Sequence, residues 1–144
     1  YSEGLGFPDA RVALVPDWDA ALDCANSGDL NAPAWEAEEQ LRAALSTQIL
    51  EEMSEEAANV ALTYVGARVA AELEEHMEEV AALWDIDDKS FLNAAAGAAV
   101  QAAHNMALAI VADADETHPF RHKFQMFAQG RWPIGITGST FNLF

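Results

Sequence analysis

Residues 90–112 read SFLNAAAGAAVQAAHNMALAIVA and carry no charged side chain, in a protein with a net charge of −17. Alanine dominates this stretch, and alanine has the highest intrinsic helix propensity. A helix that is apolar on every side has to be surrounded by other helices. The stretch therefore predicts a buried, alanine-rich central helix at about 90–112, in an all-α fold. Its few polar side chains are Ser90, Asn93, Gln101, His104 and Asn105.

The same stretch is long enough to span a membrane. However, amide and imidazole side chains are costly in lipid. The flanking segments, DIDDK at 85–89 and DADE at 113–116, also lack the excess of Lys and Arg that usually marks the ends of a membrane span. We therefore expect a helix packed inside a soluble protein, with no membrane partner.

A second strong helix signal runs from Pro33 to Ile86. One helix over this range would be roughly 75 Å long, which does not fit a domain whose radius of gyration is about 15 Å. Ser54 is the best break, because it can cap a helix whose first turn carries Glu55 and Glu56. The sequence thus predicts two helices, at about 34–52 and 55–84.

The remaining segments complete one domain over 1–144. A short helix is expected after Asp17, and another from Pro119, where proline is favoured at the first helical position. The chain is divided into an extended N-terminal arm at 1–16, a compact bundle of four to five helices at 17–129, and an apolar C-terminal arm at 130–144. Residues 10–15 of the first arm could form a strand, and the second arm a strand or hairpin.

Two features favour a homodimer. The predicted helix at 55–84 is about 45 Å long, so it would overhang a small domain. The C-terminal Phe141, Leu143 and Phe144 are too apolar to be left in water without a partner.

The charge distribution narrows the choice of partners. Almost all of the acidic residues lie in residues 1–89, whereas residues 90–144 are close to neutral. Such an acidic surface repels nucleic acid, so we expect no nucleic-acid partner, and it suits a cationic protein partner. The single Cys24 cannot form an internal disulfide, and no signal-peptide pattern is visible, so a cytoplasmic location is expected.

The candidate ligand-binding residues are Gln101, His104 and Asn105 of the alanine-rich helix. Buried polar groups need hydrogen-bond partners, and these could come from a small ligand. The alternative is that the three side chains only satisfy one another and the core.

A candidate metal site combines Glu72 and His76 with His104. If the helices at 55–84 and 90–112 form an antiparallel hairpin, Glu72 approaches His104. Clusters of Glu and His inside a bundle are typical of di-iron proteins, although the characteristic Glu-x-x-His spacing is absent. A second acidic and histidine-containing segment at 113–122 is interpreted mainly as helix-capping residues. No cofactor can be assigned.

The sequence contains no GxSxG, HExxH, P-loop, GxGxxG or CxxC motif. We therefore predict a non-catalytic acidic helical protein for protein–protein interaction or small-ligand binding. The alternative is a helical-bundle metalloprotein or enzyme that uses Glu72, His76 and His104. Whether the protein is an enzyme stays open at this level.

Overall fold

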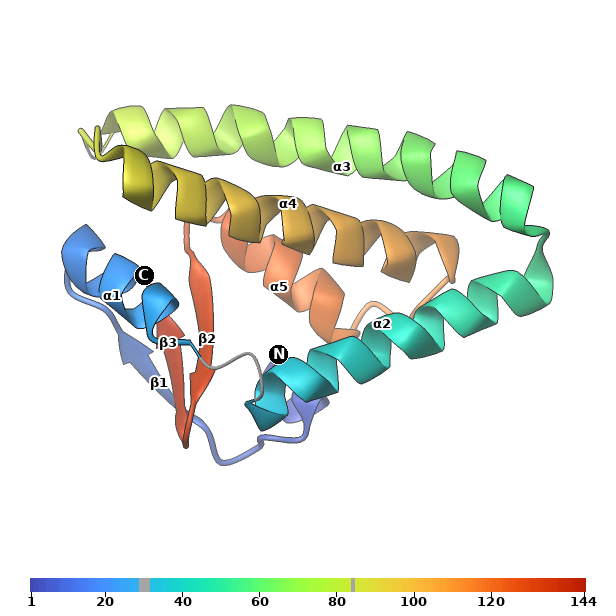
Figure 1. Cartoon of the computed structure of the whole chain (residues 1–144), viewed down its shortest axis with the longest axis horizontal. Helices are drawn as coiled ribbons and strands as arrows, with labels where there is room; N and C mark the ends of the chain where they lie inside the picture. The colour runs from blue at the N-terminus through green and yellow to red at the C-terminus, as the bar shows by residue number, and fades with distance from the viewer. Residues whose placement is uncertain (29–31, 84) are drawn as a thin grey trace.

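The computed structural model describes residues 1–28, 32–83 and 85–144 (Figure 1). The fold is mostly helical and includes a small three-stranded sheet. The helices are α1 (Trp18–Asn26), α2 (Pro33–Glu52), α3 (Glu55–Leu83), α4 (Lys89–Val111) and α5 (Pro119–Ala128). A 3-10 turn, η1 (Glu3–Leu5), precedes them, and the strands are β1 (Arg11–Leu14), β2 (Pro133–Thr137) and β3 (Thr140–Leu143).

The alanine-rich helix α4 lies at the centre of the helical layer, because it contacts each of α1, α2, α3 and α5. It runs antiparallel beside α3, as Figure 1 shows. A Cβ atom added at Gly66 of α3 would lie only 4.0 Å from the Cβ of Ala107 on α4. Small side chains therefore let these two helices approach closely.

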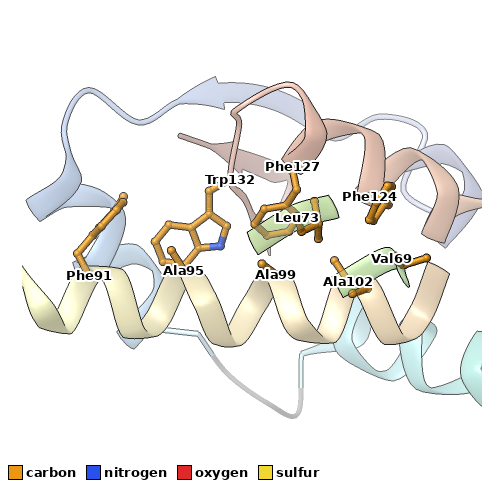
Figure 2. Packing of buried hydrophobic residues seen from close by; sticks show 11 residues of the cluster. Val69, Leu73, Phe91, Ala95, Ala99, Ala102, Phe124, Phe127 and Trp132 are labelled. Carbon is orange, nitrogen blue, oxygen red and sulfur yellow. The ribbon is translucent and has the colours of Figure 1, made fainter. Parts of the chain in front are cut away.

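One stripe of α4 forms the middle of the main core. Phe91, Ala95, Ala99 and Ala102 follow one another at helical spacing and are buried. Figure 2 shows side chains of α3, of α5 and of the segment just before β2 gathered over this stripe. These side chains are Val69, Leu73, Phe124, Phe127 and Trp132.

The expectation that α4 is buried on every side is wrong. Asn93, Ala96, Gly97 and His104 are exposed, and Val100 is 65% exposed. The four neighbouring helices cover the opposite side, and the polar Asn93 and His104 mark the face that meets solvent. By length and composition alone α4 could cross a membrane, but 44% of its most apolar segment is buried inside the protein.

The helix boundaries follow capping side chains, of which Asp17 and Ser54 were expected from the sequence, while Asp87, Asp88 and Ser90 were equal candidates for the start of α4. The Asp17 side chain accepts a hydrogen bond from the Ala20 amide at 2.8 Å at the start of α1. Ser54 separates α2 from α3, and its hydroxyl accepts from the Ala57 amide at 3.3 Å. Asp88 caps α4 through the Phe91 amide at 2.8 Å. These bonds satisfy amides that the first helical turn leaves without partners.

The two arms do not extend away from the protein, and in this respect the all-α prediction is corrected. They pair in one sheet of order β1-β3-β2, in which β1 runs parallel to β3 and β2 runs antiparallel to it. Phe141 and Leu143 of β3 are buried with Leu5 and Ile136. The apolar C-terminus thus has a partner within its own chain and no longer argues for a second copy.

Candidate functional site

A cavity of about 610 Å³ lies between four elements. Its walls come from the end of α1, the start of α2, the middle of α4 and strand β2. Ligand sites for small molecules commonly have volumes of about 300–1,000 Å³. Apolar walls are provided by Trp35, Ala94, Trp132 and Ile136. The cavity is therefore large enough for a small organic molecule.

Two opposite charges are buried beside this cavity. Glu38 of α2 and Lys123 of α5 both line it, and they are 4% and 7% exposed. The Lys123 ammonium donates a hydrogen bond to Glu38 Oε1 at 2.6 Å. Removing either charge from water costs several kcal/mol, and this direct contact offsets much of that cost.

Two further donors hold the Glu38 carboxylate. The Tyr1 hydroxyl donates to Oε1, and Arg42 Nη1 donates to Oε2 at 3.4 Å. Burial first, and then the adjacent Glu38 charge, raise the pKa of Tyr1 far above its usual value. Tyr1 therefore stays a hydrogen-bond donor over the whole physiological pH range. Arg42 also pairs with Glu39, at 2.6 Å, so the two acids and two bases of this network balance one another in charge.

The Lys123 ammonium has N–H donors left for a further hydrogen-bond acceptor. An ammonium group has three N–H donors. Within residues 1–28, 32–83 and 85–144, the hydrogen bond found for Lys123 is the one to Glu38. Its Nζ also lies 5.7 Å from the centre of the Tyr1 ring, a favourable position for a cation over an aromatic face. An anionic group in the cavity could accept the other donors.

The sequence contains a pattern that indicates this ion pair. Lys123 lies on the face of α5 that carries Phe120 and Phe127, at spacings of three and four. Glu38 precedes Leu45 of α2 by seven positions and so shares its apolar stripe. A charge on an apolar helix stripe requires a buried partner, and here each helix supplies the partner of the other.

The three predicted ligand-binding residues separate in the structure. Gln101 lines the cavity together with Glu38 and Lys123. Asn105, one turn further along α4, is 1% exposed, and neither polar atom of its amide has a hydrogen-bond partner among the described residues. His104, between Gln101 and Asn105 in the chain, is exposed to solvent, so its expected burial is wrong.

The residues proposed for a metal site are only partly brought together. Glu72 and His76 border one small hollow on α3 with Glu79, whose carboxylate lies 3.8 Å from His76 Nδ1. His104 does not border this hollow. Among the residues that the structure describes, no three His, Cys, Asp or Glu side chains are close enough to hold a metal ion.

The segment at 113–122 has mainly a capping role. Asp115 accepts hydrogen bonds from the Thr117 amide at 2.7 Å and hydroxyl at 2.6 Å, and these bonds lower the pKa of its carboxyl. His118 Nδ1 accepts from the Phe120 amide at 3.2 Å at the start of α5. Burial lowers the pKa of His118, which favours the neutral ring that this cap requires.

Cys24 lines the cavity, but its surroundings do not make it a nucleophile. Burial raises the pKa of its thiol, so the unreactive protonated form is favoured near neutral pH. The residues around the cavity therefore fit binding better than covalent chemistry.

Comparison of the chain with protein-family models, with curated proteins and with solved structures finds no match.

Proposed function

We propose that the protein binds a small organic anion in the cavity between α1, α2, α4 and β2. The observation that carries this proposal is Lys123, a nearly buried ammonium group on the cavity wall that uses one of its three donors, toward Glu38, among the described residues. A carboxylate is the simplest group that would accept these donors through a charge-assisted hydrogen bond.

The other walls support an organic ligand over an inorganic ion. Trp35, Trp132 and Ile136 provide apolar surface for a hydrocarbon or aromatic body. Gln101 adds an amide that can donate and accept a hydrogen bond. This combination of apolar walls and a few converging polar groups is typical of small-molecule sites.

Binding is proposed in preference to the alternative of a Glu/His metalloprotein. His104 lies on the solvent-facing side of α4, away from the hollow that Glu72 and His76 share. The charged groups that the fold does bury together are Glu38, Lys123 and Arg42.

Thermal unfolding with a panel of aliphatic and aromatic carboxylates, each paired with its neutral amide, tests the proposal. A ligand present at 100 times its Kd stabilises a protein by about 2.7 kcal/mol, which is readily seen as a higher Tm. We expect at least one carboxylate to raise the Tm and its amide to have little effect.

Two lysine variants test whether the rise in Tm depends on Lys123 at the cavity. Lys123→Met should abolish the rise in Tm, whereas Lys89→Met, which removes the same charge from an exposed position at the start of α4, should preserve it. The double variant Lys123→Met/Glu38→Gln removes both buried charges and should also fail to respond. Equal shifts by acid and amide, or equal losses in the two lysine variants, would contradict the proposal.

A further inference from the structure

An apolar groove, separate from the cavity, runs between α3 and α4. It has a volume of about 410 Å³ and includes the exposed side of α4, where Val100 is 65% exposed. Ala70, Met77 and Ala81 of α3 face it from one side, and Leu92, Ala96 and Val100 of α4 from the other. An apolar groove between two helices can receive the apolar face of a third helix.

The dimensions of the groove suit a helix. Its α3 wall extends from Ala70 to Ala81, which corresponds to about 17 Å at 1.5 Å per residue. A partner helix of about three turns would fill this length. The alanines along both walls would let its backbone approach closely, as small residues do wherever helices pack at short distance.

The charge along the groove specifies the chemistry of that helix. Glu74 and Glu78 line the α3 side, one helical turn apart, and both are exposed. The α4 side is apolar, since Leu92, Ala96 and Val100 line it and residues 90–112 carry no charge. A bound helix would therefore meet acids along one edge only, and Lys or Arg residues one turn apart would complement them.

A second copy of this chain is a poorer occupant. A two-fold interface brings the same surface of both copies together. Glu74 and Glu78 of both copies would then enter one interface, whose α4 walls carry no Lys or Arg to pair with them, and carboxylates brought into an interface without cationic partners are unfavourable. We propose that the α3–α4 groove binds an amphipathic helix of a partner protein, whose apolar face enters the groove and whose Lys or Arg residues face Glu74 and Glu78.

The test uses a fluorescently labelled helical peptide with Leu and Ala on one face and Lys along its flanks. Two peptides serve as controls, one with every Lys replaced by Glu and one with the same residues in shuffled order. Fluorescence anisotropy at 0.15 M salt, which screens interactions beyond about 8 Å, should show binding of the first peptide and at least tenfold weaker binding of both controls.

Charge-reversed variants of α3 distinguish the groove from the acidic surface as a whole. Glu74→Lys/Glu78→Lys should weaken binding about tenfold. Glu75→Lys/Glu79→Lys makes the same change of charge at the same spacing, but on the side of α3 that borders the His76 hollow, and should change binding less than twofold. Equal weakening by the two pairs would overturn the proposal, because it would indicate general attraction to an acidic protein.

Val100→Asn and Val60→Asn provide the matching test of the apolar contact, because the two valines are 65% and 67% exposed and only Val100 lines the groove. We expect at least fivefold weaker peptide binding for Val100→Asn and no change for Val60→Asn. Sedimentation equilibrium that shows a dimer dissociated by Val100→Asn would overturn the proposal in favour of a second copy. Flotation with anionic vesicles that depends on Val100 would overturn it in favour of a membrane surface.

Discussion

At the residue scale, the contact between Glu38 and Lys123 connects side chains that are 85 positions apart in the chain. A buried ion pair adds little net stability compared with a well-packed apolar pair, because both charges lose their water. Breaking the pair is costly, however, because the remaining charge is then buried alone. The pair therefore fixes how α2 and α5 meet at the cavity more than it stabilises the fold.

Glu38→Gln should lower the free energy of unfolding by about 3–5 kcal/mol, since it leaves the Lys123 ammonium buried without a carboxylate. Chemical denaturation measures this difference. Glu39→Gln is the matched control, because the Glu39 side chain is 65% exposed and its ion pair with Arg42 should contribute only about 0–1 kcal/mol. Similar losses in the two variants would contradict the burial of the Glu38–Lys123 pair.

Tyr1 gives the protein a specific alkaline sensitivity. Its pKa in the folded state is raised above the unfolded value by burial and by Glu38, so folding favours the protonated hydroxyl. This contribution is fully present below about pH 10 and is lost as the pH rises further, by about 1.4 kcal/mol per pH unit. The free energy of unfolding, measured by chemical denaturation at several pH values between 8 and 11, should fall more steeply with rising pH for the wild type than for Tyr1→Phe. Parallel curves would show that Tyr1 is not held by Glu38.

At the element scale, local chemistry predicted the helices well. Ser54 divides α2 from α3 and Asp88 starts α4, because side-chain caps act on amides within three residues. The sheet could not be deduced in this way. Residues 10–15 and the C-terminal arm were possible strands on local grounds, but the pairing of Val12 with Phe141 joins positions far apart in the chain, which local chemistry does not specify.

The candidate site was predicted even less completely, for the same physical reason. Gln101 was recognised because an amide stands out in an apolar helix. Glu38 and Lys123 each lie on an apolar helix stripe, which indicates a buried partner, but the sequence does not specify that the two are partners across 85 positions. His104 was expected inside, since the sequence of α4 does not specify which of its faces lacks a neighbouring helix.

The close packing of α4 can be tested with two alanines on different faces. Ala102 is 0% exposed and lies in the core with Val69 and Phe124 (Figure 2), whereas Ala96 lies on the solvent-facing side. Ala102→Leu should lower the free energy of unfolding by about 1–3 kcal/mol through overpacking. Ala96→Leu should change it by no more than about 0.5 kcal/mol, as is usual for surface sites. Equal effects in chemical denaturation would mean that the orientation of α4 is wrong.

At the scale of the whole molecule, α4 separates two surfaces with different properties. One side contributes to the core and, through Gln101, to the cavity that Glu38 and Lys123 also line. The other side contributes to the acidic-edged groove with α3. The net charge of −17 therefore does not describe the local environment that a ligand would meet, because the charged side chains of Glu38 and Lys123 on the cavity wall are one acid and one base. The homodimer that was expected from the long α3 stays a prediction.

The central claim is that an organic anion binds beside Lys123, and tryptophan indole signals in a two-dimensional nitrogen–proton NMR spectrum test it most directly. Trp35 and Trp132 line the cavity, whereas Trp18 contacts Phe91 in the core outside it. During titration with the carboxylate that raises the Tm most, the indole signals of Trp35 and Trp132 should shift and that of Trp18 should stay in place. Shifts of Trp18 equal to those of Trp35 and Trp132, or no shift of either cavity tryptophan, would contradict the claim.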